Sequence, residues 1–524
     1  MTEMKGMAEP QTGISYAVLI VEALTRHPGR TAFIQDDRSI SFGETAEYTS
    51  RIQQVLQARG ITAGSCVGAL SPNTPEVWMV QAAGCLTGAR YTGLHPMGSV
   101  DDHVGLCDDA EIDVLVVHPK FAEAGARIAA RATTVKHLLT LGPAGVGEDL
   151  FALCAQVEAQ ALTPGPAGEE DISWLQYTGG TTGRAKGVMI SHRAMVAEVL
   201  SLSASWRLPL DPRTLIATPI THAGVLPVLP TLLRGGTVVL QQGFVPEQWL
   251  AAVETHRINY VFTIPTLLYA LLGHDGIDRF DLSSLETVVY GASPMSPARL
   301  KDVRAVFGPK LLQGYGQTEC VGMATCLLPV DHERPELLSS CGRAVAGARV
   351  EVLGDDGEPV RAGSVGEICI RSRAVMSGYW KRPAETADAL RGGWLHTGDM
   401  AYRDAGGYFH IVDRLKDMVV SGGFNIYPSE IENVLTEDPS VATAAVIGVP
   451  DPKWGEALKA FVTVRPGHTV DIEALIAGVK TRKGSHCAPK SVEIVDQLPL
   501  TNVGKIDKKA LRARYWQGFE RAVN

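Results

Sequence analysis

The sequence predicts an α/β fold with a large N-terminal part of several subdomains and a small α+β domain at the C-terminus. Short β-rich runs alternate with helical periods over most of the chain, short strands separated by turn residues follow Pro335, and mixed α/β character returns in the C-terminal part. Alternation of this kind is typical of βα units with largely parallel sheets. The chain has 524 residues, of which 45% are hydrophobic and 20% charged, enough for several packed units.

Each part of the chain has its own pattern. In 1–190, DVLVVHP predicts a strand and PEVWMVQAAGCLTG a helix; in 191–330, TVVL and YVFTIP predict buried strands and PEQWLAAVETH a helix. In 335–413, VGEICIRS and GGYFHIVDR predict a small antiparallel or barrel-like unit. We expect a boundary near 414–417. Beyond it, 417–524 contains a predicted helix around PSEIENVLTED and predicted strands at TAAVIGVP and ALKAFVTV.

Charge and cysteine usage argue against several classes of protein. Lys and Arg number 48 and Asp and Glu 57, so the formal net charge is −9 and neither a general nucleic-acid binder nor an anionic-membrane binder is expected. No run approaches the roughly 20 apolar residues of a membrane-spanning helix, and the N-terminus lacks the pattern of a signal peptide. The nine cysteines form no C-x-x-C pair, which favours buried thiols in a reducing compartment. We therefore expect a cytoplasmic protein with small-molecule ligands.

The strongest local motif is YTGGTTGRAKG, which begins at Tyr177 and lies between two predicted strands. Its glycines let backbone amides approach an anion, and its threonines and lysine supply donors. The Gly-Lys-Ser/Thr ending of the usual nucleotide P-loop is missing. A glycine-rich surface turn is the alternative, but the concentration of these residue types within one short segment favours phosphate binding. The candidate phosphate contacts are Thr178, Gly179, Gly180, Thr181, Thr182, Gly183 and Lys186.

At this motif the chain resembles the adenylate-forming (AMP-binding) superfamily, which contains acyl- and aryl-CoA ligases, adenylation domains and beetle luciferases. The family's other motifs follow in order along almost the whole chain: TPITHAGV from Thr218, YGASP from Tyr290, GYGQTE from Gly314, GEICIR from Gly366 with GYW from Gly378, GWLHTGD from Gly393, DRLKD from Asp413, SGGFNIYPSE from Ser421 and PLTNVGK from Pro499. So many motifs in register leave little room for coincidence. The branch that the chain resembles is that of the acyl-CoA and aryl-CoA synthetases, including fatty-acid–CoA ligases.

The resemblance implies an architecture. An N-terminal adenylation domain over 1–413 would hold two stacked mixed α/β sheets and a small β-barrel. A hinge over 414–416, with Lys416 as the hinge residue, would connect it to a mobile C-terminal lid domain over 417–524. Its subdomains would cover roughly 1–190, 191–330 and 335–413.

The resemblance also implies a reaction that uses ATP, Mg²⁺ and CoA. A carboxylic acid would be converted to its acyl-adenylate with release of pyrophosphate, and domain rotation would then let the CoA thiol take the acyl group. Such a site must supply cations and oriented amides to the charge that develops on phosphate. The catalytic residues implied are Lys505, Thr178, Glu319 and His222, with Glu319 as the Mg²⁺ ligand. The remaining ATP contacts implied are Gly291, Ala292, Ser293, Gly314, Tyr315, Gly316, Thr318, Asp399 and Arg414. Asp399 and Arg414 would bind the ribose, Tyr315 would lie beside the adenine, and Thr318 would contact the α-phosphate. The CoA channel would be lined by Ser421, Gly422 and Gly423.

The presumed acyl pocket favours an apolar acid. His222 stands at the family's gate between the acyl pocket and ATP. Ala223 occupies the position where amino-acid-activating relatives usually place an aspartate, and a methyl group cannot pair with an α-ammonium cation. We therefore expect an apolar acyl or aryl acid, whose size stays open. The acyl contacts implied are His222, Ala223, Gly224, Gly291, Gly316 and Gly322.

Two positions of the phosphate loop depart from the family's usual sequence. Gly179 replaces a serine, and Ala185 replaces a proline that would fix φ, so we expect a less rigid loop but no lost charge.

Three alternatives to CoA ligation follow from the same resemblance. The chain could load a separate carrier protein, oxidise its adenylate as luciferases do, or bind ATP or acyl-adenylate as a non-catalytic sensor. The intact Lys186, Glu319 and Lys505 argue against a sensor. Some carrier-loading relatives have an insertion after the barrel-like section, and its absence between Asp413 and Ser421 favours CoA. Carrier loading stays open, as does the choice between a monomer and a homodimer.

Overall fold

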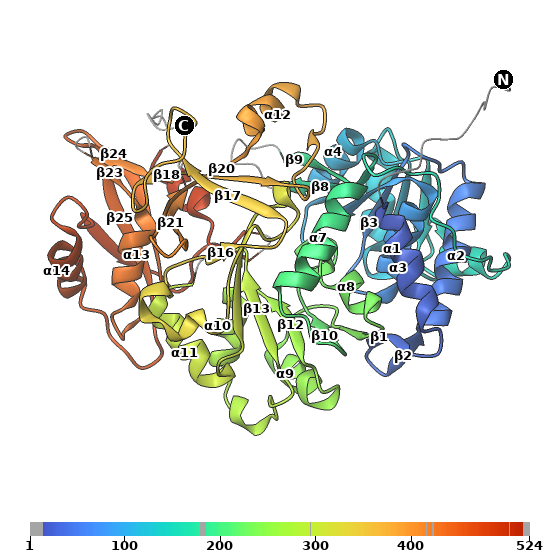
Figure 1. Ribbon diagram of the computed structural model, residues 1–524, viewed down its shortest axis with the longest axis horizontal. Coiled ribbons are helices and arrows are strands. Elements are labelled where there is room, and N and C mark those ends of the chain that lie inside the picture. Colours follow the sequence, from blue (N-terminus) through green and yellow to red (C-terminus); the bar gives the residue numbers. More distant parts are fainter. Residues whose placement is uncertain are drawn as a thin grey trace, which may run out of the picture. The chain divides into compact units, whose positions relative to one another are not determined.

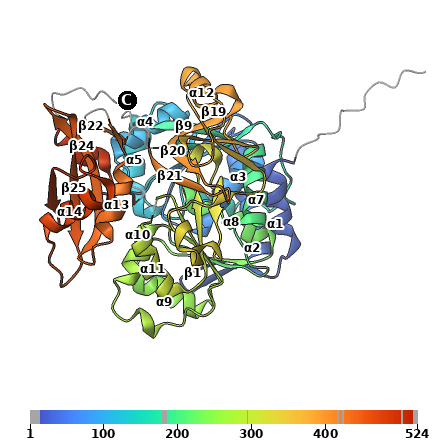
Figure 2. The same cartoon turned by 60° about the vertical axis from the view of Figure 1, so that its left-hand side comes forward.

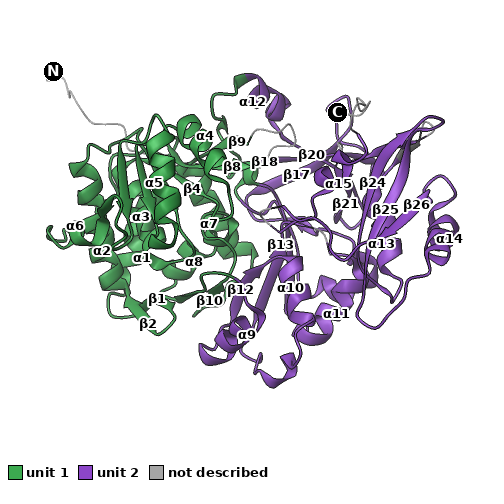
Figure 3. Cartoon of the chain, turned by 180° about the vertical axis from the view of Figure 1, so that it is seen from behind, with its two compact units in different colours: residues 1–243, 318–321, 372–383 green, residues 244–317, 322–371, 384–524 purple. Residues whose placement is uncertain are grey.

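The computed structural model describes residues 14–178, 185–293, 295–414, 417–421, 424–501 and 504–516. The chain forms two compact units, coloured separately in Figure 3. Unit 1 comprises Met1–Gly243, Thr318–Val321 and Ser372–Pro383, and unit 2 comprises Phe244–Gln317, Gly322–Arg371 and Ala384–Asn524. Two short segments from the middle of the chain therefore belong to the N-terminal unit. This division differs from the expected domains over 1–413 and 417–524, which stay a prediction.

The main sheet of unit 1 has eight strands in the order β19-β9-β8-β4-β3-β5-β6-β7. Its central strands are parallel, and β8 and β9 form an antiparallel hairpin. The bounds are β3 (Cys66–Leu70), β4 (Arg90–Leu94), β5 (Val114–Val117), β6 (His137–Thr140), β7 (Glu148–Asp149), β8 (Ile172–Thr178), β9 (Lys186–Ser191) and β19 (Gly378–Tyr379).

A second set of strands in unit 1 has the order β10-β11-β1-β2, in which only β1 and β2 are antiparallel. These are β1 (Thr31–Gln35), β2 (Arg38–Ser41), β10 (Arg213–Ile216) and β11 (Thr237–Leu240). The helices, in blue to green in Figure 1, are α1 (Tyr16–Arg26), α2 (Phe42–Ala58), α3 (Pro75–Thr87), α4 (Val100–Ala110), α5 (Ala122–Arg131), α6 (Leu150–Cys154), α7 (His192–Ser205) and α8 (Val228–Leu233).

Helix α3 shows why the sequence folds locally as it does. Thr74 caps it by accepting a hydrogen bond from the Val77 amide, Pro75 occupies its first turn, and Gly88 ends it in the left-handed conformation. Every residue of the helix is buried, which explains why its sequence is apolar all round rather than amphipathic.

Unit 2 begins with parallel strands β12 (Tyr260–Thr263), β13 (Thr287–Gly291) and β14 (Leu311–Tyr315), continued by antiparallel β15 (Thr325–Leu327) and β16 (Arg343–Ala344). Helices α9 (Pro246–Thr255), α10 (Pro265–Leu272) and α11 (Pro297–Phe307) belong to this part. The barrel-like unit expected for 335–413 is a four-stranded sheet in the order β17 (Ala348–Leu353), β18 (Val365–Ser372), β20 (Leu395–Arg403) and β21 (Phe409–Arg414). Helix α12 (Pro383–Ala389) precedes β20.

The C-terminal elements have a sheet and core of their own. The strands are β22 (Val419–Ser421), β23 (Phe424–Ile426), β24 (Val441–Asp451), β25 (Gly455–Val464) and β26 (Ser491–Ile494), and the helices are α13 (Pro428–Thr436), α14 (Ile472–Lys483) and α15 (Lys508–Ala513). Figure 2 shows β22, β24, β25, α13 and α14 as one group. Buried side chains that include Ile431, Val446 and Val462 form its core.

The predicted α/β class is confirmed, and the strands and helices predicted above from sequence runs are present, among them β5, β11, β12, α3, α9 and α13. All nine cysteines are buried. Within the described residues, no helix combines the length and apolarity needed to cross a membrane. The expected hinge residue Lys416 lies outside the described residues.

Candidate active site

The phosphate-loop motif falls on the β8–β9 hairpin of unit 1. The register pairs Thr178, the last residue of β8, with Lys186, the first residue of β9, and the Thr178 hydroxyl donates to the Lys186 carbonyl at 3.5 Å. The two residues therefore lie side by side, one at the end of β8 and the other at the start of β9. The other expected phosphate contacts, Gly179, Gly180, Thr181, Thr182 and Gly183, lie outside the described residues.

Three side chains of unit 1 meet beside this hairpin. The ammonium nitrogen of Lys186 lies 5.0 Å from the ring centroid of Tyr379, whose hydroxyl donates to Oε1 of Glu319 at 2.8 Å. Tyr379 reaches this place because β19 pairs with β9, and Glu319 because its carbonyl accepts the Met376 amide at 2.8 Å. We call Lys186, Thr178, Glu319 and Tyr379 the phosphate group of residues. The sequence analysis did not predict that Tyr379 belongs to the site, although Tyr379 is the central residue of the GYW motif.

The phosphate group of residues fits a magnesium ion. Mg²⁺ is commonly held by one or two carboxylates together with phosphate oxygens and waters. Glu319 supplies the carboxylate, and Lys186 a cation within the same set. Thr318, the expected α-phosphate contact, is the neighbour of Glu319 at the start of a short 3₁₀ turn.

The expected gate residue His222 is a half-buried neutral imidazole. Its Nδ1 lies 3.0 Å from the Thr221 hydroxyl, and its ring packs edge-on against His95 with the centroids 4.9 Å apart. Burial, together with the neighbouring His95, lowers the pKa of His222 to about 3, so the ring carries no charge near neutral pH. Ala223 is exposed, whereas Gly224 is buried. His95 had no sequence signal, because it lies 127 positions away, and only the fold brings it beside His222.

The expected ribose contacts meet in unit 2. Asp399 is 6% exposed, and its Oδ2 accepts the Tyr315 hydroxyl at 2.7 Å. Arg414 is its partner across β20 and β21, with Nε 3.3 Å from Oδ1 of Asp399. Burial and the Asp399 charge hold the pKa of Tyr315 well above its usual value, so the hydroxyl remains a donor. We call Tyr315, Asp399 and Arg414 the ribose group of residues.

A second carboxylate, not singled out from the sequence, supports the turn before Asp399. Glu367 accepts the Gly398 amide at 2.8 Å and His396 Nδ1 at 2.6 Å, and it pairs with Arg391 at 3.0 Å. The ligand atoms of Glu367, Cys369 and His396 lie within 4.8 Å of one another, an arrangement that a metal ion could use. Burial raises the pKa of Cys369 to about 12, so the thiol is protonated when no metal ion is bound. We interpret the group as hydrogen-bonded support for Asp399.

Two glycine-rich motifs end the neighbouring strands β13 and β14, with Gly291 opposite Gly314. Ala292, which follows Gly291, has φ +67°, a left-handed conformation that is rare outside glycine and concentrates at functional sites. A Cβ at Gly316 would lie 1.7 Å from the carbonyl oxygen of Gly322. These two expected acyl contacts therefore touch through their backbones, and only glycine fits at 316. Ser293, which follows Ala292, is half-buried.

Lys505 sits on a closed turn. Its amide donates to the Thr501 hydroxyl at 3.1 Å, and its carbonyl accepts the Thr501 amide at 2.7 Å. A Cβ at Gly504 would lie 2.9 Å from Cδ1 of Ile264, so the turn lies against the start of α10. Of the expected CoA contacts, Ser421 ends β22, and Gly422 and Gly423 lie outside the described residues.

Comparisons with known proteins match these motifs over most of the chain. Residues 20–380 match the family described as AMP-binding enzyme, and residues 430–505 match the AMP-binding enzyme C-terminal domain. The chain is 42% identical over 519 residues to a medium/long-chain-fatty-acid–CoA ligase of Mycobacterium tuberculosis, covering 96% of this chain and 91% of the relative. It is 40% identical over 491 residues to a feruloyl-CoA synthase of Amycolatopsis sp, covering 93% and 96%. Among solved structures, an amide bond synthetase from Marinactinospora thermotolerans superposes with a TM-score of 0.89 at 35% identity, covering 95% and 99%.

Proposed function

Because the chain belongs to the family of AMP-binding enzymes, we propose that it is an AMP-forming carboxylic acid–CoA ligase. It uses ATP, Mg²⁺ and CoA, and its acid is an apolar acyl or aryl acid. The two relatives named above support a CoA ligase over a carrier-loading enzyme, a luciferase or a sensor, since one is a fatty-acid–CoA ligase and the other a feruloyl-CoA synthase. The observation that carries the proposal is the phosphate group of residues, in which a cation, a phenol hydroxyl and a carboxylate meet.

The reaction has two steps. In the first, a carboxylate oxygen of the acid attacks the α-phosphorus of ATP, and the bond from that phosphorus to the pyrophosphate oxygen breaks. In the second, the CoA thiolate attacks the acyl carbon, and the bond to the AMP oxygen breaks. A Mg²⁺ ion held by Glu319 would neutralise charge on the phosphate oxygens in the first step. Lys186 supplies positive charge beside Glu319, and Lys505 is the catalytic lysine of the first step in this proposal.

The ribose group of residues binds the nucleoside. Asp399 accepts hydrogen bonds from the ribose hydroxyls, and Arg414 and Tyr315 hold that carboxylate in place. Gly291, Ala292 and Ser293 line the adenine with the Tyr315 ring. Since ribose does not change charge during the reaction, these contacts act on ATP and on the transition state alike.

The neutral His222 suits a gate beside an apolar acyl chain, because an imidazolium there would demand a counter-charge. Ala223, exposed at the start of a 3₁₀ turn, offers a methyl group to the acid. The cytoplasmic location and a homodimer stay predictions.

The test is AMP release from MgATP with medium-chain and long-chain fatty acids and hydroxycinnamic acids, each with and without CoA. Acid-dependent AMP release that requires CoA, with a thioester detected by mass, is the expected result. Acid-dependent pyrophosphate exchange without a thioester would instead indicate a carrier protein or, as for the amide bond synthetase, an amine as the acceptor. No nucleotide turnover with any acid would contradict the proposal.

A further inference from the structure

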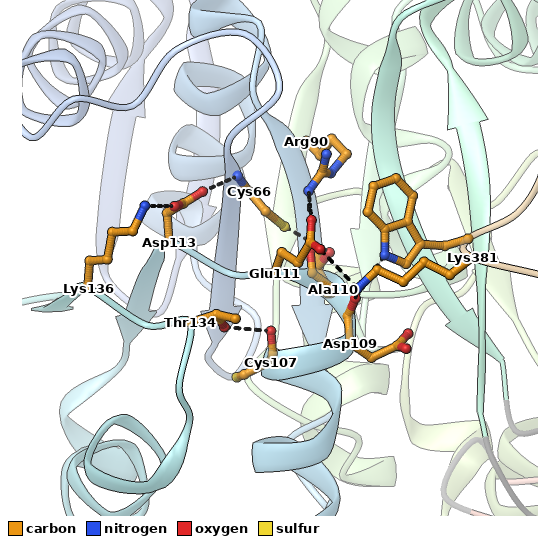
Figure 4. A network of polar contacts seen from close by, with 12 residues as sticks. Cys66, Arg90, Cys107, Asp109, Ala110, Glu111, Asp113, Thr134, Lys136 and Lys381 are labelled. Carbon is orange, nitrogen blue, oxygen red and sulfur yellow. Dashed lines mark hydrogen bonds and ion pairs between the residues drawn. The ribbon is translucent and has the colours of Figure 1, made fainter.

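The last turn of α4 carries a carboxylate that the proposed chemistry does not use. Asp109 is the residue before Ala110, where α4 ends, and its Oδ2 accepts the Tyr177 hydroxyl at 2.5 Å. Its backbone carbonyl accepts two further donors, Trp380 Nε1 and Lys381 Nζ, each at 2.8 Å. Figure 4 shows Lys381 reaching this carbonyl. An aspartate at a helix C-terminus faces the negative end of the helix dipole, so helix stability alone does not favour it there.

These donors connect Asp109 to both strands of the phosphate hairpin. Tyr177 immediately precedes Thr178 in β8. On the other strand, the Trp380 amide donates to the carbonyl of Gly187, the neighbour of Lys186, at 2.7 Å. One residue of α4 therefore reaches the hairpin next to Thr178 and next to Lys186.

Tyr177 and Trp380 both pack tightly against Gly187. A Cβ at Gly187 would lie 3.1 Å from Cζ of Tyr177 and 3.2 Å from Cβ of Trp380, so a side chain at this position would crowd both residues. The Arg90 guanidinium stacks on the Trp380 ring at 4.4 Å. Burial and the Asp109 carboxylate raise the pKa of Tyr177, which keeps its hydroxyl a donor.

The surrounding charges hold the end of α4 itself. Glu111 pairs with Lys381 at 3.0 Å and lies 3.9 Å from Arg90, which also donates to the Ala110 carbonyl at 3.3 Å (Figure 4). These contacts hold the end of α4 beside the hairpin. Just beyond α4, Asp113 makes a separate set of contacts, because it accepts the Cys66 amide and pairs with Lys136.

We propose that Asp109 is a positioning residue for the adenylation step, acting through Tyr177 and Trp380 to hold Thr178 and Lys186 where they meet the triphosphate of ATP. The inference rests on the proposed function. Because it concerns the triphosphate, it applies to ATP and not to AMP, whose single phosphate does not extend to the β and γ positions. A merely structural contact would weaken both nucleotides or neither.

The experiment measures dissociation constants of MgATP and AMP by calorimetry for the wild-type chain and for Asp109→Asn, Tyr177→Phe and the double variant. The matched control is Asp113→Asn, near the same end of α4, because the Asp113 carboxylate contacts Cys66 and Lys136 rather than a described residue of the hairpin. We expect Tyr177→Phe, which removes the bond, to weaken MgATP roughly 10-fold, since small misplacements of binding groups are costly. Asp109→Asn should weaken it less, because the amide oxygen still accepts the hydroxyl but carries no charge. In both variants AMP should change less than about 2-fold. The double variant should match Tyr177→Phe, because without the hydroxyl residue 109 has no bond left to accept.

Three results would overturn the inference. They are unchanged MgATP affinity in Tyr177→Phe, equal weakening of MgATP and AMP, or an Asp113→Asn variant as weak as Asp109→Asn. If Asp109→Asn does not fold, Tyr177→Phe carries the test, because it removes one hydroxyl and keeps the ring. Absence of MgATP binding by the wild-type chain would contradict the proposed function and this inference together, whereas wild-type binding with unaffected variants contradicts the inference alone.

Discussion

The phosphate group of residues in unit 1 and the ribose group of residues in unit 2 each combine a carboxylate, a tyrosine hydroxyl and a cation. They differ in how deeply the carboxylate is buried. In the former, the half-buried Glu319 accepts the Tyr379 hydroxyl, and Lys186 lies over the Tyr379 ring. In the latter, a nearly fully buried Asp399 is held by the Tyr315 hydroxyl and Arg414. In the proposed function, the first set would face groups whose charge changes during adenylation, and the second a sugar that does not react. We therefore expect changes to Glu319 or Lys186 to lower kcat and changes at the ribose to raise KM for ATP.

The largest effect is expected at Lys505 of unit 2, for which we propose a catalytic role at the α-phosphate. Lys505→Ala should slow acyl-adenylate formation roughly 10²- to 10³-fold, the range for loss of one group that stabilises transition-state charge. Thioester formation from supplied acyl-adenylate should be spared. The exposed Lys509, four positions further along the chain, gives the matched control Lys509→Ala. Equal loss in both half-reactions, measured by rapid quench, would contradict the role.

Asp399→Asn should raise KM for ATP roughly 10- to 100-fold with kcat nearly unchanged, because it weakens uniform binding through a charge-assisted hydrogen bond. Steady-state kinetics with ATP varied at saturating acid and CoA would measure this. A fall in kcat with unchanged KM would place Asp399 on the reacting side and break the comparison.

The lowered pKa of the half-buried His222 predicts a pH dependence of stability. Its pKa is about 3 in the folded chain against 6.5 in the reference state, so the unfolded chain binds more protons below pH 6.5 and stability falls as pH falls through that window. Between pH 7 and pH 5 the wild type should lose about 2 kcal/mol more unfolding free energy than His222→Asn. Denaturant unfolding at both pH values measures this. Parallel losses in the two proteins would show that His222 is not held neutral.

The smallest effect is expected at Glu367, which supports the turn before Asp399. Glu367→Gln keeps an acceptor for the Gly398 amide but loses the charge that pairs with His396 and Arg391. KM for ATP should rise about 3- to 10-fold, with kcat unchanged. Glu351→Gln is the control, because Glu351 pairs with arginines elsewhere on the same sheet. A change in kcat alone would contradict a positioning role at the ribose.

Sequence motifs predicted which residues lie near one another when the residues belong to one motif or to neighbouring strands. Thr178 and Lys186 occupy the ends of one hairpin, and Asp399 and Arg414 face each other across two neighbouring strands, as their motifs suggest. The sequence analysis missed contacts between distant segments. The Tyr379–Glu319 bond spans 60 positions and the Tyr177–Asp109 bond 68, and both depend on which strand β19 and helix α4 lie beside. Chain order does not reveal such pairings, because tertiary packing decides them.

The central claim is that Glu319 of the phosphate group of residues acts on the transition state, whereas Asp399 of the ribose group of residues acts on binding. The most direct test is single-turnover formation of acyl-adenylate at saturating MgATP by Glu319→Gln and Asp399→Asn. The account predicts that Glu319→Gln remains slow, by roughly 10- to 100-fold, however much ATP is present, and that Asp399→Asn approaches the wild-type rate. Full recovery of Glu319→Gln at high ATP, with Asp399→Asn still slow, would contradict it.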